Sequence, residues 1–334
     1  MTQIIKDADK NHWVYRMPKG WIPYLQLSRL DRPIGYWLLA LPGWIALSFA
    51  SLSHGLAVTD LKWAALILIG AIAMRGAGCT YNDIVDRDLD AKVERTALRP
   101  IPAGTVSVKQ SWLWLAAQCI VGLIVLLFLP RLAQIIALCS IPLVAAYPFM
   151  KRITWWPQVW LGMTFNWAAL VAYAAKTGEI SPGAFILYLG LIFWTIGYDT
   201  IYACQDIEDD AFVGIKSTAR RFGKHVKSGV AMSYLLCFFI LFTLSPLSIW
   251  GPVIYEGPLY WNGIPEREST LEIFSVLEGL IRDLPAVPFG LHLAYQVYRL
   301  NSEKDDLSLK LFKSNFWAAI LLVLGFALSG YLLM

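Results

Sequence analysis

Charged residues are scarce in this chain of 334 residues. Asp, Glu, Lys and Arg together make up 16% of it, whereas about 25% is usual for soluble domains. The five cysteines lie in or beside apolar segments, with no CxxC pair and no metal-type spacing, and the four histidines are scattered along the chain. These absences argue against a soluble protein, and we expect no zinc, no haem and no nucleic-acid partner.

A targeting segment is also lacking. The opening stretch, MTQIIKDADKNHWVYRMPKG, has no apolar signal core, and it is not rich in Ser and Arg and poor in acids, as an organelle transit peptide would be. We therefore expect the first apolar run to be a mature membrane span. A bacterial inner membrane is the simplest location.

Apolar sequence, by contrast, is abundant, since 57% of the residues are hydrophobic. Long, nearly uncharged windows recur along the chain, and about 20 such residues span a bilayer. Only helices satisfy their backbone inside lipid without closing a barrel, so the sequence predicts an all-α polytopic membrane protein. The nine expected transmembrane helices cover about residues 33–52, 61–80, 111–130, 132–149, 156–175, 183–203, 229–247, 284–298 and 315–333.

Lys and Arg are distributed asymmetrically between the connections. The N-terminal tail and the connections after spans two, four, six and eight hold most of the 28 Lys and Arg residues, which places them on the cytoplasmic side and the C-terminus outside. We expect a tail over residues 1–32 and one transmembrane domain over 33–334. Within it, 248–283 should form an extracytoplasmic loop with a short amphipathic helix that begins at Ser269 or Thr270.

Two acidic segments lie just beyond the cytoplasmic ends of the second and sixth expected spans. DRDLDAKV (86–93) and DIEDDAFV (206–213) share the pattern D-x-x-x-D-A-x-V. We interpret this as a pseudo-repeat of four helices, so that two four-helix units plus one further helix surround a central cavity. Both acidic helix ends would then face that cavity.

The spacing of these acids predicts a cation between the segments. Asn82, Asp86 and Asp90 fall on one helical stripe, and Asp206 and Asp210 share the same four-residue spacing. Like charges at this spacing repel on a helix, so either nearby Lys and Arg or a divalent metal should balance them. Mg²⁺ is the stronger candidate, because it prefers carboxylate oxygens and shares its shell with substrate phosphates. We interpret these five residues as ligands of two or more Mg²⁺ ions bridged by a diphosphate; solvated acidic loops are the alternative.

At these residues the sequence resembles the UbiA-type intramembrane prenyltransferases, and within them the 4-hydroxybenzoate branch. NDIVDRDLD matches the family's first motif, N-D-x-x-D-R-x-x-D, and is followed by AKVERTALRPIPAG. YDTIYACQDIEDDAFVGIKSTA matches the second motif. The stretches YPFMKRITWWPQVWLGMTFNWAAL and RLDRPIGYWLLALPGW resemble the branch.

The resemblance implies nine transmembrane helices around a central cavity and a specific reaction. A polyprenyl diphosphate and 4-hydroxybenzoate would give 3-polyprenyl-4-hydroxybenzoate and diphosphate, an early membrane step of ubiquinone synthesis. The prenyl tail would leave the cavity sideways into the lipid bilayer. The resemblance also implies that Arg75 binds the carboxylate of the aromatic acid, for which a planar guanidinium is suited; an ion pair with Asp199 is the alternative. Asp199 is in addition a candidate base near the phenol.

Other polar and aromatic residues are candidates for substrate contacts. Basic residues that either contact diphosphate or merely add positive charge to the cytoplasmic side are Lys151, Arg152, Lys216, Arg95 and Arg99. Asn166 either contacts substrate or bridges helices. Aromatic rings that either stabilise an allylic cation or pack are Tyr147, Tyr198 and Tyr202.

Three other functions are compatible with parts of the sequence. The first is prenyl transfer to another acceptor, such as homogentisate, a naphthoate or haem. The second is a CDP-alcohol phosphotransferase, which requires a D-G-x-x-A-R pattern that this sequence lacks. The third is an ion-coupled transporter, but transporters tend to hold isolated carboxylates near mid-membrane, whereas these aspartates cluster toward one face.

Overall fold

The computed structural model describes residues 12–242, 281, 284–301 and 305–333. The described residues form helices joined by turns, and no strand occurs among them. The expected loop and short helix over 248–283 lie outside the described residues, apart from residue 281.

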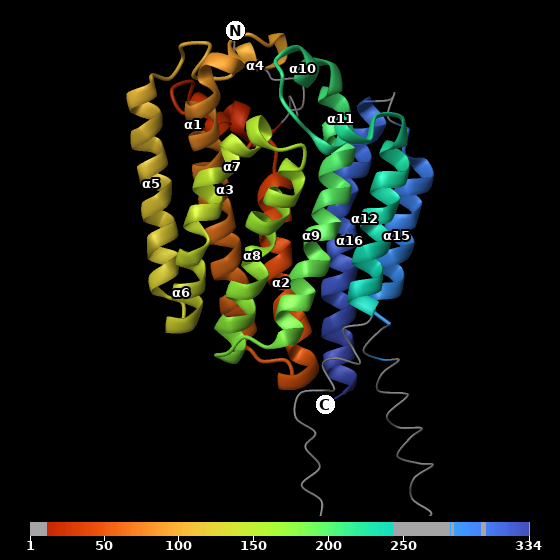
Figure 1. Ribbon diagram of the computed structural model, residues 1–334. Coiled ribbons are helices and arrows are strands. Elements are labelled where there is room, and N and C mark those ends of the chain that lie inside the picture. Colours follow the sequence, from red (N-terminus) through yellow and green to blue (C-terminus); the bar gives the residue numbers. More distant parts are fainter. Residues whose placement is uncertain (1–11, 243–280, 282–283, 302–304, 334) are drawn as a thin grey trace, which may run out of the picture.

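Long helices run side by side in one bundle (Figure 1). They are α2 (Ile34–His54), α3 (Thr59–Asp90), α5 (Val108–Leu127), α6 (Arg131–Cys139), α7 (Ile141–Ile153), α8 (Pro157–Thr177), α9 (Pro182–Ala203), α12 (Val226–Phe242), α15 (Ala286–Arg299) and α16 (Asp305–Leu332). Seven segments of the described chain are long and apolar enough to cross a membrane, and they match seven of the nine expected spans. Helices α8 and α15 occupy the positions of the other two, and α15 has only 14 residues.

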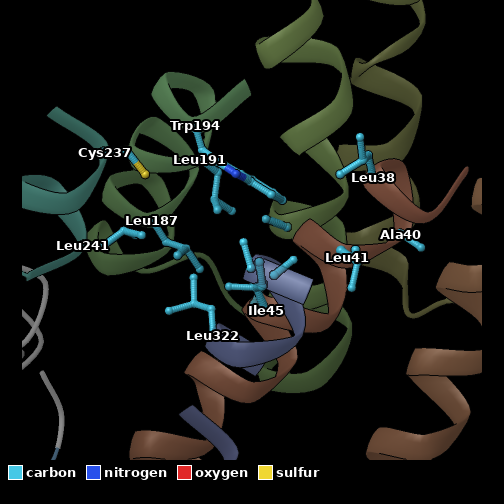
Figure 2. Packing of buried hydrophobic residues seen from close by; sticks show 14 of the residues in the cluster. Leu38, Ala40, Leu41, Ile45, Leu187, Leu191, Trp194, Cys237, Leu241 and Leu322 are labelled. Carbon is cyan, nitrogen blue, oxygen red and sulfur yellow. The ribbon is translucent and has the colours of Figure 1, made fainter. Parts of the chain in front are cut away.

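The core lies around α2, which packs against α3, α8 and α16. Figure 2 shows Leu41 and Ile45 of α2 meeting Leu187 and Leu191 of α9 and Leu322 of α16. Because α2 is apolar on nearly all sides, it can be buried on nearly all sides. Helix α2 is therefore a central packing element of the described bundle.

Small residues let neighbouring helices approach closely. A Cβ atom at Gly43 of α2 would lie 2.7 Å from Cγ2 of Ile67 on α3, and one at Gly197 of α9 would overlap the ring of Tyr234 on α12. Close approach at small residues is the usual way in which helices pack inside membranes, where the lipid tails are as apolar as the side chains.

Helix α3 is long enough to carry the first acidic segment out of the bilayer core. Its 32 residues measure about 48 Å at 1.5 Å per residue, whereas the hydrocarbon core is about 30 Å thick. Asn82 and Asp90 therefore belong to the last turns of a continuous helix and not to a loop.

Short helices gather at the same end of the bundle as this acidic segment. They are α1 (Ile22–Leu27), α4 (Glu94–Ala97), α10 (Ile207–Phe212) and α11 (Thr218–Phe222), and the C-terminal end of α16 lies at the opposite end (Figure 1). The described part of the expected N-terminal tail is folded and packed, since Val14, Ile22 and Leu27 are buried.

The opposite end of the bundle is held by a buried lysine at the C-terminal end of α8. Lys176 Nζ donates to Ser51 Oγ at 2.7 Å, to the Gly55 carbonyl at 2.9 Å and to Asp60 Oδ2 at 2.6 Å. All three ammonium hydrogens therefore have acceptors, and α8 is fixed to the turn between α2 and α3.

Candidate functional site

A cavity of about 890 Å³ lies among α2, α3, α5, α7, α8, α9 and α16. This volume is within the range of about 300–1,000 Å³ that is typical of small-molecule sites. One end of the cavity is polar, and side chains of both acidic segments line it: Asn82, Asp83, Asp90, Asp206, Asp209 and Asp210. The structure therefore brings the two segments to one hollow.

The side chain of Asp86 differs from its neighbours in the first acidic segment because it does not line the cavity. It is fully buried. Its carboxylate accepts hydrogen bonds from Lys151 and, at 2.7 Å, from Arg152 Nη2. Lys151 lines the cavity, whereas Arg152 does not. In this structure Asp86 and Arg152 pair with each other, and neither side chain lines the cavity.

Asp83 and Asp90 of α3 are joined by a chain of ion pairs. Arg29 Nη2 donates to Asp83 Oδ1 at 2.7 Å. Arg99 Nη1 lies 3.3 Å from the same oxygen and 2.7 Å from Asp90 Oδ2. Nearby basic residues therefore relieve the repulsion along the first segment, which was one of the two arrangements that the sequence left open.

Arg29 is a site residue that the sequence analysis missed. It lies in the turn between α1 and α2 with φ of 55°, a backbone conformation that is rare for residues other than glycine and is found at functional sites. Burial opposes its charge, but the carboxylates of Asp83 and Asp31 outweigh that effect and hold the Arg29 pKa above its ordinary value. The signal that could have revealed it was the RLDRPIG stretch, which begins at this residue.

The carboxylate and amide oxygens at the polar end are the type of ligand that Mg²⁺ prefers. Among the described residues, no three or more His, Cys, Asp or Glu side chains lie close enough to hold a metal by themselves. Asp83 Oδ2 is buried without a hydrogen-bond partner in the described structure, and it faces a cavity lined by further carboxylates. This suits Mg²⁺, which is usually held by one or two carboxylates together with water and substrate phosphates.

The second acidic segment begins at the last residue of the 3-10 turn η2 (Cys204–Asp206), which follows α9, and continues through the short helix α10. Asp206 and Asp210 line the cavity, and so does Lys216, which follows them in the chain. Lys216 Nζ donates to the carbonyl of Ile153 at 3.1 Å, so its ammonium group is attached to the end of α7. Arg95 belongs to α4, and its side chain lies outside the described structure.

Arg75 lies in the wall of the cavity, where the charge of Asp199 acts on it without a direct ion pair. Its Nε is buried without a hydrogen-bond partner, and no ion pair joins it to Asp199 or to another described carboxylate. The guanidinium lies over the ring of Phe165, with its carbon 5.2 Å from the ring centroid. A Cβ atom at Gly35 would lie 2.8 Å from Arg75 Nε, so the absence of a side chain at Gly35 makes room for the guanidinium.

Asp199 and three tyrosines line the same cavity. The three are Tyr147, Tyr198 and Tyr202. Tyr198 is fully buried and meets the ring of Trp194 edge to face, and the Tyr202 ring lies 4.6 Å from that of Phe312. The rings therefore form a packed aromatic wall beside Asp199.

Asn166 does not reach this cavity. Its Nδ2 donates to the carbonyls of Gly162 and Leu191 and, at 2.8 Å, to Thr195 Oγ1. It is absent from the cavity wall, so of its two expected roles the structure supports the bridge between α8 and α9.

Comparison with known sequences identifies a family. The model of the UbiA prenyltransferase family matches residues 36–264. The mitochondrial 4-hydroxybenzoate polyprenyltransferase of Rattus norvegicus is 40% identical, over 94% of this chain and 76% of its own length. The 4-hydroxybenzoate geranyltransferase 1 of Lithospermum erythrorhizon is 44% identical, over 82% of this chain and 87% of its own length.

Solved structures share the fold. A UbiA homolog from Aeropyrum pernix K1 superposes with a TM-score of 0.64 at 21% identity, covering 87% of this chain and 97% of its own. A UbiA homolog from Archaeoglobus fulgidus bound to GPP and Mg²⁺ gives a TM-score of 0.61 at 18% identity, covering 93% of this chain and 98% of its own.

The expected bacterial inner membrane is contradicted by these relatives. The enzymes of Rattus norvegicus, Drosophila melanogaster and Bos taurus that match are mitochondrial. The inference failed because apolar length and charge asymmetry describe how a chain lies in a bilayer, and they do not distinguish one membrane from another.

The family match, the 40% identity over nearly the whole chain and the shared helical fold agree, and the chain belongs to the UbiA prenyltransferase family.

Proposed function

We propose that this protein transfers a polyprenyl group from a polyprenyl diphosphate to the 3-position of 4-hydroxybenzoate and releases diphosphate, as a step of ubiquinone biosynthesis. The observation that carries the proposal is the composition of one cavity. Its acidic and basic end suits a metal-bound diphosphate, and its wall holds the guanidinium of Arg75, whose buried Nε has no hydrogen-bond partner and which suits a carboxylate. Relatives that carry the name 4-hydroxybenzoate polyprenyltransferase support the choice of acceptor.

The polar end would bind the diphosphate. Asn82, Asp90, Asp206 and Asp210 line the cavity with oxygen atoms and would hold Mg²⁺, which when bound supplies positive charge to the leaving diphosphate. Lys151 would contact the diphosphate directly, and the buried carboxylate of Asp86 would hold that ammonium group in place.

Basic residues around this end add to the binding of the diphosphate. Arg99 and Lys216 line the cavity, and Arg99 is already oriented by Asp90 at 2.7 Å. Arg29 would act beside them through Asp83. Charge-assisted hydrogen bonds to phosphate oxygens are among the stronger ones in proteins, so a fixed set of such donors favours departure of the diphosphate.

The acceptor would lie deeper in the cavity. Arg75 would bind its carboxylate through two parallel hydrogen bonds, which turns the ring so that the phenol faces the polar end. The bond between the allylic carbon and the diphosphate oxygen breaks with both electrons on oxygen. The ring carbon next to the hydroxyl forms the new bond, and Asp199 would accept the proton that is released.

The aromatic wall would protect the allylic cation. Tyr147, Tyr198 and Tyr202 present ring faces and edges to the cavity, and ring faces stabilise cations. The remaining lining is largely apolar along α3, α5 and α8, for example at Gly70, Val125 and Val171, and suits a prenyl tail that continues into the bilayer.

A transfer assay tests the proposal. Membranes that contain the protein are mixed with isotope-labelled 4-hydroxybenzoate, geranyl diphosphate and Mg²⁺, and we expect a labelled lipid product and free diphosphate. Product from homogentisate or a naphthoate but not from 4-hydroxybenzoate would assign another acceptor. Absence of diphosphate release with every acceptor would contradict prenyl transfer and favour a transporter.

A further inference from the structure

A backbone hydrogen bond to the carbonyl of Asp210 closes the turn at the end of the second acidic segment. Helix α10 ends at Phe212, and Gly214 takes φ of 75°, which reverses the chain. The N–H of Ile215 then donates to the Asp210 carbonyl at 2.8 Å, the bond that terminates a helix with a glycine in the left-handed region. The position of Asp210 therefore depends on how this turn is held.

Arg220 of α11 holds the turn from outside. Its Nη1 donates to the Asp210 carbonyl at 3.2 Å and also to the carbonyl of Ile215. Its guanidinium lies over the ring of Trp155, with its carbon 5.4 Å from the ring centroid. Trp155 lies in the turn between α7 and α8, so one guanidinium connects three segments of the chain.

The same turn is also attached to the end of α7. The N–H of Lys216 donates to the carbonyl of Lys151 at 2.9 Å. The side chain of Lys151 in turn pairs with Asp86 of the first acidic segment. Asp210 is thus hydrogen-bonded to Ile215, the next residue Lys216 is hydrogen-bonded to Lys151, and Lys151 pairs with Asp86. These contacts join the two acidic segments.

We propose that Arg220 is a positioning residue for the diphosphate site. It does not line the cavity, so it acts by fixing the backbone of Asp210 against the turn between α7 and α8 and by setting the distance between the two acidic segments. Both bonds come from Nη1, and the planar face of the same guanidinium stacks on the indole of Trp155, a stacking that a lysine ammonium cannot reproduce. The inference rests on the proposed function of Asp210.

Two substitutions of Arg220 and one of its neighbour form the test. Arg220→Met removes the donors and keeps most of the side-chain volume, and Arg220→Lys keeps the charge but loses the planar group. Arg221→Met is the matched control, because Arg221 is exposed, adjacent and identical in charge, and no side-chain contact of it occurs in the described structure. The full chain is purified in detergent, and binding of inorganic diphosphate with Mg²⁺ is measured by calorimetry. KM values for geranyl diphosphate and 4-hydroxybenzoate are measured in parallel.

We expect Arg220→Met to weaken binding of inorganic diphosphate with Mg²⁺ about tenfold, because the turn that places Asp210 loses two charged hydrogen bonds. The KM for geranyl diphosphate should rise by a similar factor, while the KM for 4-hydroxybenzoate should stay unchanged. Arg220→Lys should lie between Arg220→Met and the unaltered protein, and Arg221→Met should match the unaltered protein.

Three results would overturn the inference. The first is diphosphate binding by folded Arg220→Lys equal to that of the unaltered protein, which would reduce the role of Arg220 to its charge. The second is an equal loss in Arg221→Met. The third is a parallel rise in both KM values, which indicates general loosening of the fold. If the unaltered protein itself neither binds diphosphate with Mg²⁺ nor releases it, the proposed function fails instead.

Discussion

Replacing Gly35 with alanine would displace Arg75 without removing its charge. The added Cβ atom would lie 2.8 Å from Arg75 Nε, closer than the roughly 3.4 Å at which such atoms normally meet. The guanidinium must therefore shift by about half an ångström. Gly78 provides the control, because it lies on α3, lines the same cavity and has open space around its Cβ position.

The size of the effect follows from the geometry of a carboxylate bound by a guanidinium. A displacement of about 1 Å at a binding group can cost about a hundredfold in rate, so half that shift should lower kcat/KM for 4-hydroxybenzoate about tenfold. Arg75→Met removes both donors to the carboxylate and should cost about 3 kcal/mol, or about a hundredfold. Neither change should affect the KM for geranyl diphosphate, because Arg75 lies beyond the acidic end of the cavity.

The assay compares two acceptors. Transfer to 4-hydroxybenzoate is measured beside transfer to phenol, which lacks the carboxylate that Arg75 would bind. Gly35→Ala and Arg75→Met should impair the first reaction and leave the second at the level of the unaltered protein, and Gly78→Ala should impair neither. Equal losses with both acceptors, or an unchanged KM for the acid in Arg75→Met, would refute the assignment of Arg75.

Further substitutions separate the residues of the site from those of the scaffold. Asp206→Ala should abolish labelled product while the protein remains inserted and monodisperse in detergent, and raising Mg²⁺ should not restore activity, because an oxygen ligand is lost from the polar end. Asn166→Ala should lower the midpoint of thermal unfolding and leave both KM values unchanged, since its amide bonds α8 to α9; a selective rise in the acceptor KM would restore it as a substrate contact. Lys176→Met leaves the half-buried Asp60 without its cation and should cost about 1–3 kcal/mol of stability, whereas unchanged thermal unfolding would contradict that role.

Sequence alone was sufficient for the helices because their causes are local. Apolar length predicts a membrane helix whatever its neighbours are, and the expected span over 183–203 coincides with α9 (Pro182–Ala203). The expected span over 132–149 proved to be two helices, α6 and α7, because Pro142 lies in the first turn of α7 and has no N–H to continue the hydrogen-bond pattern of α6. The expected span over 61–80 covers only the apolar part of α3, while the spacing of Asn82, Asp86 and Asp90 had already placed those residues on a helical stripe.

The sequence identified candidate residues of the site but not the ion pairs between them. A spacing of four residues places Asn82, Asp86 and Asp90 on one stripe, yet that stripe is wide enough for Asp86 to point toward α7 while its neighbours line the cavity. Which of the three acids meets Lys151 depends on how α3 and α7 are rotated against each other, and rotation is set by packing across the whole bundle. The sequence could therefore identify the carboxylates but not the partner of each.

Arg29 shows a further limit of prediction from the sequence. Its importance arises from a backbone turn with φ of 55° and from Asp83, which is 54 positions away in the chain. Neither property follows from local pattern, because left-handed arginines have no sequence signature and long-range ion pairs leave no periodicity. Burying an arginine together with an acid costs desolvation free energy, and removing one partner leaves an unpaired buried charge. Such a pair therefore persists where its geometry matters more than its contribution to stability. The same reasoning explains why Arg29, Arg99 and Lys151 are all held by carboxylates: an acid that fixes a cation beside a cavity prepares that cation for an anionic ligand.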